Sequence, residues 1–121
     1  MAATILIIDD EIHIRRLTAR MLEMAGFQVL EAASGPLALR VLEDAKPDVI
    51  TCDISMPGMT GFEVLQAIKS QPATATIPVI MLTAIGQDKD AARATALGAA
   101  DYITKPFSST KLIETIERQL T

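Results

Sequence analysis

Five short apolar runs alternate along this chain with segments whose apolar residues recur every three or four positions. A short apolar run between turn residues is typical of a buried strand, and the longer period is typical of an amphipathic helix. Strands that alternate with helices form a parallel sheet, because each helix returns the chain to the same end of the sheet. The sequence therefore predicts an α/β fold with five strands, at residues 5–8, 27–31, 49–52, 79–82 and 101–104.

The five predicted strands differ in their polarity. The runs at 5–8, 49–52 and 79–82 are nearly pure aliphatic, whereas those at 27–31 and 101–104 include charged or amide residues. Central strands of a parallel sheet are buried on both faces, and edge strands are less so. This difference places the second and fifth strands at the edges. It favours the order 2-1-3-4-5, which is a flavodoxin-like, doubly wound (βα)5 arrangement.

The helical segments carry recognisable start and stop signals. The first helix is expected over residues 11–24, with Gly26 ending it, and its apolar positions are Ile14, Leu17, Met21 and Met24. Ser34 is expected to cap the second helix. Later helices are expected around residues 62–68, over 88–97 and from about Ser109 onward.

Composition and charge exclude several classes of protein. The 121 residues hold 11 Lys and Arg against 15 Asp and Glu, a net charge of −4, which argues against direct contact with nucleic acid. No apolar run approaches the ~18 residues of a membrane span, and no secretory leader opens the chain. The single cysteine, Cys52, cannot form an internal disulfide, which fits a reducing cytoplasm. We expect one cytoplasmic domain over residues 1–121 that does not bind a membrane.

Three aspartates follow two of the predicted strands. Asp9 and Asp10 come after the first strand, and Asp53 comes after the third. In the order 2-1-3-4-5 the winding direction switches between these two strands, and ligands of open parallel sheets bind at that switch. Three carboxylates in one crevice repel each other and should raise at least one pKa. A divalent cation removes this repulsion, so the sequence predicts a site for Mg²⁺ (or Mn²⁺).

The residues that follow the fourth and fifth strands carry functional groups other than carboxylates. Thr83 follows the fourth strand, and Lys105 follows the fifth, with Pro106 directly after it. Since the carboxyl ends of parallel strands meet at one edge, acids, a hydroxyl and an ammonium group should share one rim.

Taken together, these motifs resemble those of a response-regulator receiver domain of two-component signalling. Each motif alone is weak, but their order and spacing match this family from Ile5 to Leu120. The residues that carry the resemblance are Asp9-Asp10, the stretch 53–58, Gly61, Thr83-Ala84 and Lys105-Pro106-Phe107.

The resemblance implies a phosphorylation site and a metal site. Asp53 corresponds to the phosphoacceptor, which takes a phosphoryl group from a histidine of a sensor kinase or a phosphotransfer protein. Asp10 and Asp53 correspond to direct Mg²⁺ ligands, Asp9 acts largely through water, and the backbone carbonyl of Ser55 completes the protein ligands.

The resemblance also implies a conformational switch. Lys105 corresponds to the cation that pairs with a phosphoryl oxygen, and its bond to Pro106 is expected to be cis. Thr83 corresponds to the hydroxyl that moves toward the phosphoryl group, and Tyr102 to the aromatic residue that turns inward with it. Ser55 and Ile85 occupy positions at which such domains often tune the lifetime of the phosphorylated state.

A receiver domain of this kind signals and is not a metabolic enzyme, although it catalyses its own phosphorylation and slow dephosphorylation. It controls a partner or an output domain, often through the face around the fourth helix, fifth strand and fifth helix, which in some receivers forms a phosphorylation-linked dimer. The chain could be free-standing or belong to a larger regulator, and we favour the free-standing form slightly.

Two other functions share parts of this pattern. An aspartyl-nucleophile phosphatase of the haloacid-dehalogenase type would have a second acid two residues after its nucleophile, where Asp53 has Ser55. A flavodoxin-type electron carrier would have hydroxyls and glycines in the first loop, where this chain has aspartates that would repel a flavin phosphate.

Overall fold

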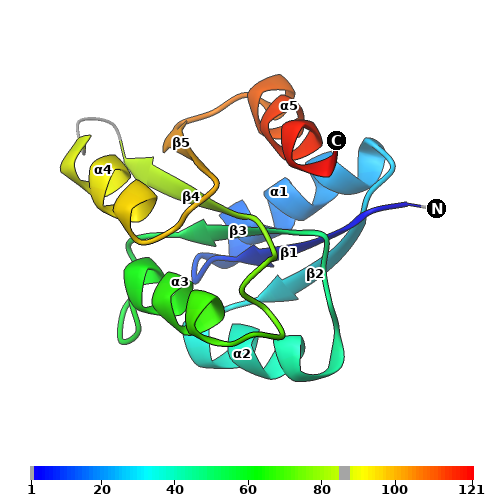
Figure 1. Ribbon diagram of the computed structural model, residues 1–121. Helices are drawn as coiled ribbons and strands as arrows, with labels where there is room; N and C mark the ends of the chain where they lie inside the picture. The colour runs from blue at the N-terminus through cyan, green and yellow to red at the C-terminus, as the bar shows by residue number, and fades with distance from the viewer. Residues whose placement is uncertain (1, 85–87) are drawn as a thin grey trace.

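The computed structural model describes residues 2–84 and 88–121, and in this part of the chain strands and helices alternate throughout (Figure 1). The strands are β1 (Thr4–Ile8), β2 (Gln28–Ala32), β3 (Val49–Asp53), β4 (Val79–Ala84) and β5 (Asp101–Lys105). The helices are α1 (Ile12–Met24), α2 (Gly35–Asp44), α3 (Gly61–Ser70), α4 (Asp88–Ala96) and α5 (Ser109–Leu120). The predicted alternation is therefore confirmed, with boundaries that shift by one or two residues.

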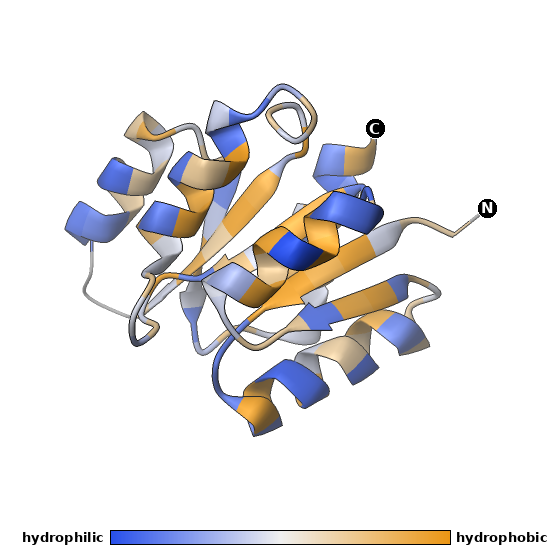
Figure 2. Cartoon of the chain, turned by 90° about the horizontal axis from the view of Figure 1, so that it is seen from below, coloured by the Kyte–Doolittle hydropathy of each residue, from blue (hydrophilic) through white to orange (hydrophobic). Residues whose placement is uncertain are grey.

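The strands form one parallel sheet in the order β2-β1-β3-β4-β5, as the polarity of the runs predicted. Every residue of β3 is buried, and β1 and β4 are buried at all but one end residue. The edge strands β2 and β5 each bury a single residue fully. Figure 2 shows the same contrast, with hydrophobic residues gathered in the strands and hydrophilic ones on the outer faces of the helices.

Two hydrophobic clusters lie on opposite faces of the sheet. Helices α1 and α5 cover one face, where Leu22 and Leu112 pack against Ile5, Ile7 and neighbouring strand residues. Helices α2, α3 and α4 cover the other face, where the core includes Leu65. Truncating a fully buried leucine such as these to alanine typically costs about 2–5 kcal/mol, so the two clusters hold the sheet that presents the site.

The predicted apolar face of α1 does not face the core. The helix forms as expected, but Ile14, Leu17 and Met24 are 40%, 57% and 82% exposed. The side chains that α1 buries against the sheet are instead Thr18, Ala19 and Leu22. Small residues let α1 lie close to the sheet, and the larger apolar residues are left on its outer side.

The start of α1 is fixed directly after the acidic pair. Glu11 is its N-cap, and the Glu11 carboxylate accepts hydrogen bonds from the backbone N–H groups of His13 and Ile14. These bonds lower the pKa of Glu11, because they favour its ionised form. At α2 the predicted cap is confirmed, since Ser34 Oγ accepts from the N–H of Leu37.

Candidate functional site

The carboxyl ends of four strands bring the predicted site residues to one edge of the sheet. Asp9 directly follows β1, Asp53 is the last residue of β3, and Lys105 is the last residue of β5. Thr83 is the penultimate residue of β4. The sheet order places the ends of β1 and β3 side by side at the point where the winding direction reverses.

The three aspartates form a single cluster. One carboxylate oxygen from each of Asp9, Asp10 and Asp53 lies within 4.8 Å of the other two. Asp9 and Asp53 are buried, whereas Asp10 is exposed. Hard oxygen ligands at this spacing suit Mg²⁺, which is typically held by one or two carboxylates with water completing its shell. The donor set therefore fits the cation predicted from the sequence.

Lys105, at the end of β5, lies next to this cluster. Its Nζ lies 3.1 Å from Oδ2 of Asp53 and 3.6 Å from Oδ2 of Asp9. The peptide bond from Lys105 to Pro106 is cis, as expected. The ammonium group thus partly balances two buried carboxylates.

The pKa of Asp53 is raised above its ordinary value, and burial is the main cause. The charge and hydrogen bond of Lys105 lower this pKa, the negative charge of Asp9 raises it, and a backbone hydrogen bond from Ser55 lowers it. The sequence predicted a raised pKa in this cluster through repulsion between carboxylates. The direction is confirmed, but desolvation contributes more than the neighbouring charge.

Glycine at position 61 lets α3 begin directly against the end of β3. A Cβ at this position would lie 2.3 Å from the carbonyl oxygen of Asp53 and 2.6 Å from Cα of Ile54, closer than real atoms approach. The N–H of Gly61 also donates to the carbonyl of Ile54, at 2.9 Å. Ser55 is exposed in the loop of residues 54–60, which joins β3 to α3. The hydrogen bond between Gly61 and Ile54 therefore joins the two ends of this loop, directly after Asp53.

The two residues predicted to switch lie near the site on adjacent strands. Thr83 is 4% exposed, and within residues 2–84 and 88–121 its Oγ1 makes one long hydrogen bond, to the carbonyl of Ala84 at 3.5 Å. Tyr102 is 45% exposed, and its ring borders a surface hollow lined by α4 residues, including Ala91 and Thr95. The tyrosine is therefore turned outward in this structure. Ile85 lies outside the described residues.

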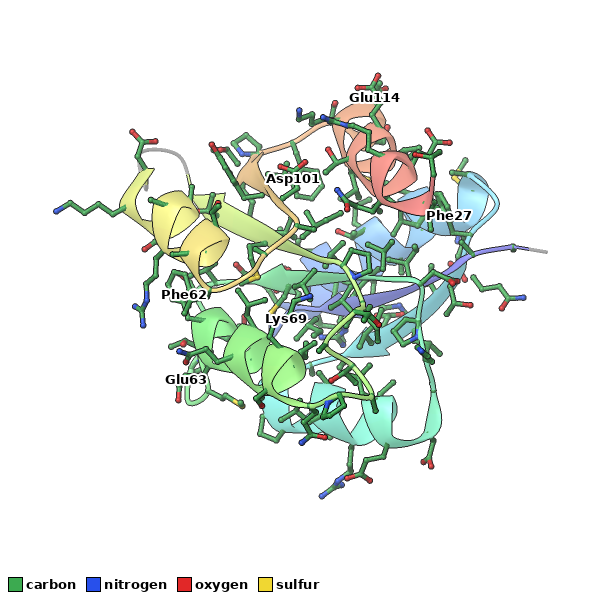
Figure 3. All side chains as sticks on the ribbon, in the orientation of Figure 1. Phe27, Phe62, Glu63, Lys69, Asp101 and Glu114 are labelled. Atoms are coloured by element: carbon green, nitrogen blue, oxygen red, sulfur yellow. The ribbon has the colours of Figure 1, made fainter. Side chains whose placement is uncertain are left out.

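The contacts of two arginines near the site were not predicted from the sequence. Arg15 of α1 donates to the backbone carbonyl of Asp9 and pairs with Glu31 of β2. Arg93 of α4 lies over the ring of Phe62, 4.3 Å from its centroid, and Figure 3 shows Phe62 at the start of α3 on the side of α4. Opposite charges and an aromatic residue were visible in the sequence, but nothing in their spacing indicated these pairs.

Comparison with known proteins agrees with this geometry. The family model of the response regulator receiver domain matches residues 5–117. Among solved structures, the chemotaxis protein CheY4 of Vibrio cholerae superposes with a TM-score of 0.92 and 36% identity, covering 98% of both chains. The receiver domain of NtrX from Brucella abortus gives a TM-score of 0.90 and 36% identity over 96% of this chain and 97% of that one.

Curated relatives extend the comparison to complete regulators. The phosphate regulon transcriptional regulatory protein PhoB of Pseudomonas aeruginosa is 44% identical over 97% of this chain and 51% of its own length. The Escherichia coli PhoB is 41% identical with the same coverage. The chain therefore spans about half the length of the curated relatives it matches.

The fold and site define an α/β signalling module with an acidic cluster at the switch point of its sheet. The chain belongs to the response regulator receiver family of two-component systems. The match supports this family over the phosphatase and the electron carrier that share parts of the sequence pattern. Among the helices in residues 2–84 and 88–121, none is long and apolar enough to cross a membrane.

Proposed function

We propose that this chain is a phosphorylation switch in which Asp53 accepts a phosphoryl group from a phosphohistidine of a sensor kinase or phosphotransfer protein. The observation that carries the proposal is the position of the Asp53 carboxylate, which is clustered with two other aspartates and lies 3.1 Å from Lys105. Phosphoryl transfer requires positioning and charge neutralisation more than elaborate covalent chemistry, and this arrangement supplies both.

The proposed metal ligands are the carboxylates of Asp10 and Asp53, with the backbone carbonyl of Ser55 and with Asp9 acting through water. Asp9 suits the indirect role, because its Oδ1 already accepts from the N–H of Glu11 at 2.9 Å and its Oδ2 faces Lys105. Asp10 is exposed and open to an incoming ion. When bound, Mg²⁺ (or Mn²⁺) would neutralise charge on the phosphoryl oxygens.

In the proposed reaction, an oxygen of Asp53 forms a bond to phosphorus as the bond from phosphorus to the donor's imidazole nitrogen breaks. The electron pair of that bond leaves with the nitrogen, and an acyl phosphate remains on Asp53. Lys105 then pairs with a phosphoryl oxygen instead of with the Asp53 carboxylate alone. Hydrolysis of the acyl phosphate by water would release inorganic phosphate and restore Asp53.

The switch follows from the contacts that the phosphoryl group adds. Among the described residues, the Thr83 hydroxyl makes one weak hydrogen bond, and a phosphoryl oxygen would offer it a stronger partner. Movement of Thr83 would open space for the ring of Tyr102, which would turn inward from its exposed position. A ligand shifts a two-state equilibrium only through contacts that differ between the states, and these two residues would supply them.

The proposed protein phosphodonor binds beside α1. A groove lined by Ile14, Leu17, Thr18 and Met21 of α1 continues to Ala84, Lys105, Pro106 and Phe107, so it borders the phosphorylation site directly. A helix of the donor that covers this apolar groove would bring its phosphohistidine to the crevice.

The proposed output surface differs from this groove and shares with it the end of β5 at Lys105. It comprises α4, β5 and α5, includes the exposed Tyr102, and would contact an output domain, a target protein or a second copy of the chain. The two PhoB relatives named above are transcriptional regulatory proteins, so a DNA-binding output domain in the same protein is one form this target can take. Residues 1–121 would form a single receiver domain.

Intact mass after incubation with Mg²⁺ and acetyl phosphate tests the proposal. The wild-type chain should gain one phosphoryl group, about 80 Da, as expected for covalent capture by a nucleophilic carboxylate. Asp53→Asn should gain none under the same conditions. Labelling of this variant to the wild-type extent would exclude Asp53 as the acceptor.

A further inference from the structure

Arg15 connects three elements behind the acidic cluster. Its side chain is 13% exposed, its Nη1 donates to the backbone carbonyl of Asp9 at 2.9 Å, and its Nε donates to Oε1 of Glu31 at 3.0 Å. The guanidinium therefore ties the first turn of α1 to the carboxyl end of β2 and to the acidic loop, defined here as residues 9–11. None of these bonds involves a carboxylate of the aspartate cluster.

Asp9 is held at nearly every polar group that it has. Its N–H donates to the carbonyl of Ala32 at 3.1 Å, its carbonyl accepts from Arg15, and its Oδ1 accepts from the N–H of Glu11. Its remaining polar atom, Oδ2, lies 3.6 Å from Nζ of Lys105. The orientation of Asp9, and through it the position of Asp10, is therefore fixed from outside the site.

Glu31 keeps this arrangement electrically neutral. A lone guanidinium next to the acidic cluster would repel an incoming divalent cation, but its partner carboxylate at 3.0 Å offsets that charge. Arg16 lies near the other oxygen of Glu31, at 3.8 Å, with a side chain that is 71% exposed and so is largely screened by water. The pair can thus supply geometry without weakening the attraction of the site for a cation.

We propose that Arg15 and Glu31 form a positioning pair that holds the acidic loop in the geometry that binds the divalent cation. This inference rests on the proposed metal site. It assigns no contact with the metal or the phosphoryl group to either residue. Groups that orient metal ligands from behind commonly change metal affinity by about 10- to 100-fold when removed.

Electrostatics and positioning predict opposite results for Arg15→Gln. If Arg15 acted only through its charge, its removal would leave the site more negative, and Mg²⁺ would bind more tightly. If Arg15 positions the acidic loop, its loss frees the Asp9 carbonyl, and Mg²⁺ binds more weakly. Arg15→Lys distinguishes the electrostatic from the positioning role further. Lysine keeps the charge, but its single nitrogen cannot reproduce the two hydrogen bonds that the planar guanidinium donates in fixed directions.

The experiment titrates Mg²⁺ by calorimetry and as the Mg²⁺ dependence of labelling by acetyl phosphate. We expect both Arg15 variants to bind Mg²⁺ about tenfold more weakly than the wild type, with labelling restored at saturating Mg²⁺. Arg16→Gln is the matched control: it removes a charge near the same glutamate without touching Asp9, and it should not weaken binding. Unchanged or tighter binding in Arg15→Gln would overturn the proposal.

A second measurement needs no metal. Hydrogen exchange at the amides of Asp9 and Glu11, followed by NMR in metal-free protein, should be faster in Arg15→Gln than in the wild type or Arg16→Gln, while the amides of β3 stay protected. Failure of the wild type to bind Mg²⁺ would count against the proposed function, and the exchange rates would still decide the positioning role. Exchange at wild-type rates in Arg15→Gln would exclude that role.

Discussion

Lys105 Nζ lies 3.1 Å from Asp53 Oδ2, and this ion pair reaches across a strand. Asp53 ends β3 and Lys105 ends β5, with β4 between them in the sheet. A change in charge or size at Asp53 therefore reaches the edge strand directly, without passing through the hydrophobic core. The same edge strand carries Tyr102, three residues before Lys105.

Asp53→Asn should make the unliganded protein more stable at neutral pH. The pKa of Asp53 is raised in the folded state, chiefly by burial, so the folded state holds its proton more tightly than the unfolded state does. The contribution of Asp53 to stability is then fully present below its unfolded-state pKa and is lost as pH rises through its folded-state pKa. Asparagine cannot ionise and escapes this loss. Urea unfolding at pH 7 and at pH 4, without Mg²⁺, measures the effect.

The stability difference between Asp53→Asn and the wild type should shrink as the pH falls from 7 to 4, because a larger fraction of Asp53 is then protonated. Asp44→Asn, at an exposed position on α2, makes the same chemical change without burial and should alter stability little at either pH. Addition of Mg²⁺ at pH 7 should narrow the difference as well, because the cation binds the carboxylate of the wild type. A less stable Asp53→Asn at pH 7 would mean that the bond to Lys105 outweighs desolvation.

Tyr102 should become less accessible when Asp53 is phosphorylated. The chain has one tyrosine and no tryptophan, so its fluorescence reports this ring alone. The ring is 45% exposed, and we expect acrylamide to quench it less after treatment with Mg²⁺ and acetyl phosphate, because the proposed switch turns it inward. Thr83→Ala should still be phosphorylated but should lose most of this protection.

Thr104→Ala serves as the matched control for Thr83→Ala. Thr104 pairs with Thr83 in the register of β4 and β5, but its side chain is exposed. The Thr104→Ala variant should therefore show the same decrease in acrylamide quenching on phosphorylation as the wild type. If quenching of the wild type does not change on confirmed phosphorylation, the tyrosine is not part of the switch.

The sequence correctly predicted those site residues whose location depends only on where a strand ends. The carboxyl end of each strand is set by where an apolar run stops, so Asp9, Asp53 and Lys105 could be placed at one edge without side-chain detail. The buried face of α1 could not be found in this way. Its large apolar residues have helical spacing, but the sheet accepts the smaller Thr18 and Ala19, and periodicity does not show which of two stripes is covered.

Pairs formed by tertiary structure were also beyond sequence reasoning. Arg15 and Glu31 are 16 residues apart, and their contact depends on how α1 crosses the end of β2. The relative contributions of burial and repulsion to the pKa of Asp53 likewise depend on how completely α1 and the β3–α3 loop exclude water. Both the Arg15–Glu31 contact and the causes of the Asp53 pKa shift can be determined only from the folded structure.

Gly61→Ala should impair both stability and phosphorylation. Its Cβ would meet the carbonyl oxygen of Asp53 at 2.3 Å and Cα of Ile54 at 2.6 Å, and backbone atoms cannot yield as a side chain can. We expect a loss of at least about 2 kcal/mol in the free energy of unfolding, since α3 and the Asp53 loop must separate. The rate of labelling by acetyl phosphate should also fall in Gly61→Ala, even at temperatures where the variant is fully folded.

Gly58→Ala distinguishes a close approach from a strained backbone. Gly58 has a φ of +74°, and a Cβ there meets nothing within 4 Å. Its replacement should cost only about 1–2 kcal/mol, the usual penalty for a left-handed residue with a side chain, and labelling should continue. Equal labelling rates for the Gly61 and Gly58 variants would show that contact between α3 and Asp53 does not matter for the chemistry.

Leu17→Ser should separate protein phosphodonors from small ones. Leu17 is 57% exposed and lines the groove beside Lys105, so serine there should cost little stability but remove apolar area from the proposed donor site. We expect phosphotransfer from a phosphorylated histidine-containing donor protein to slow by about tenfold, which corresponds to ~1.4 kcal/mol of lost contact, while labelling by acetyl phosphate stays unchanged. Leu37→Ser, at a 45% exposed site on α2 outside the groove, should alter neither rate. Equal slowing by both variants, or slowing with acetyl phosphate as well, would show that the groove along α1 does not receive the donor.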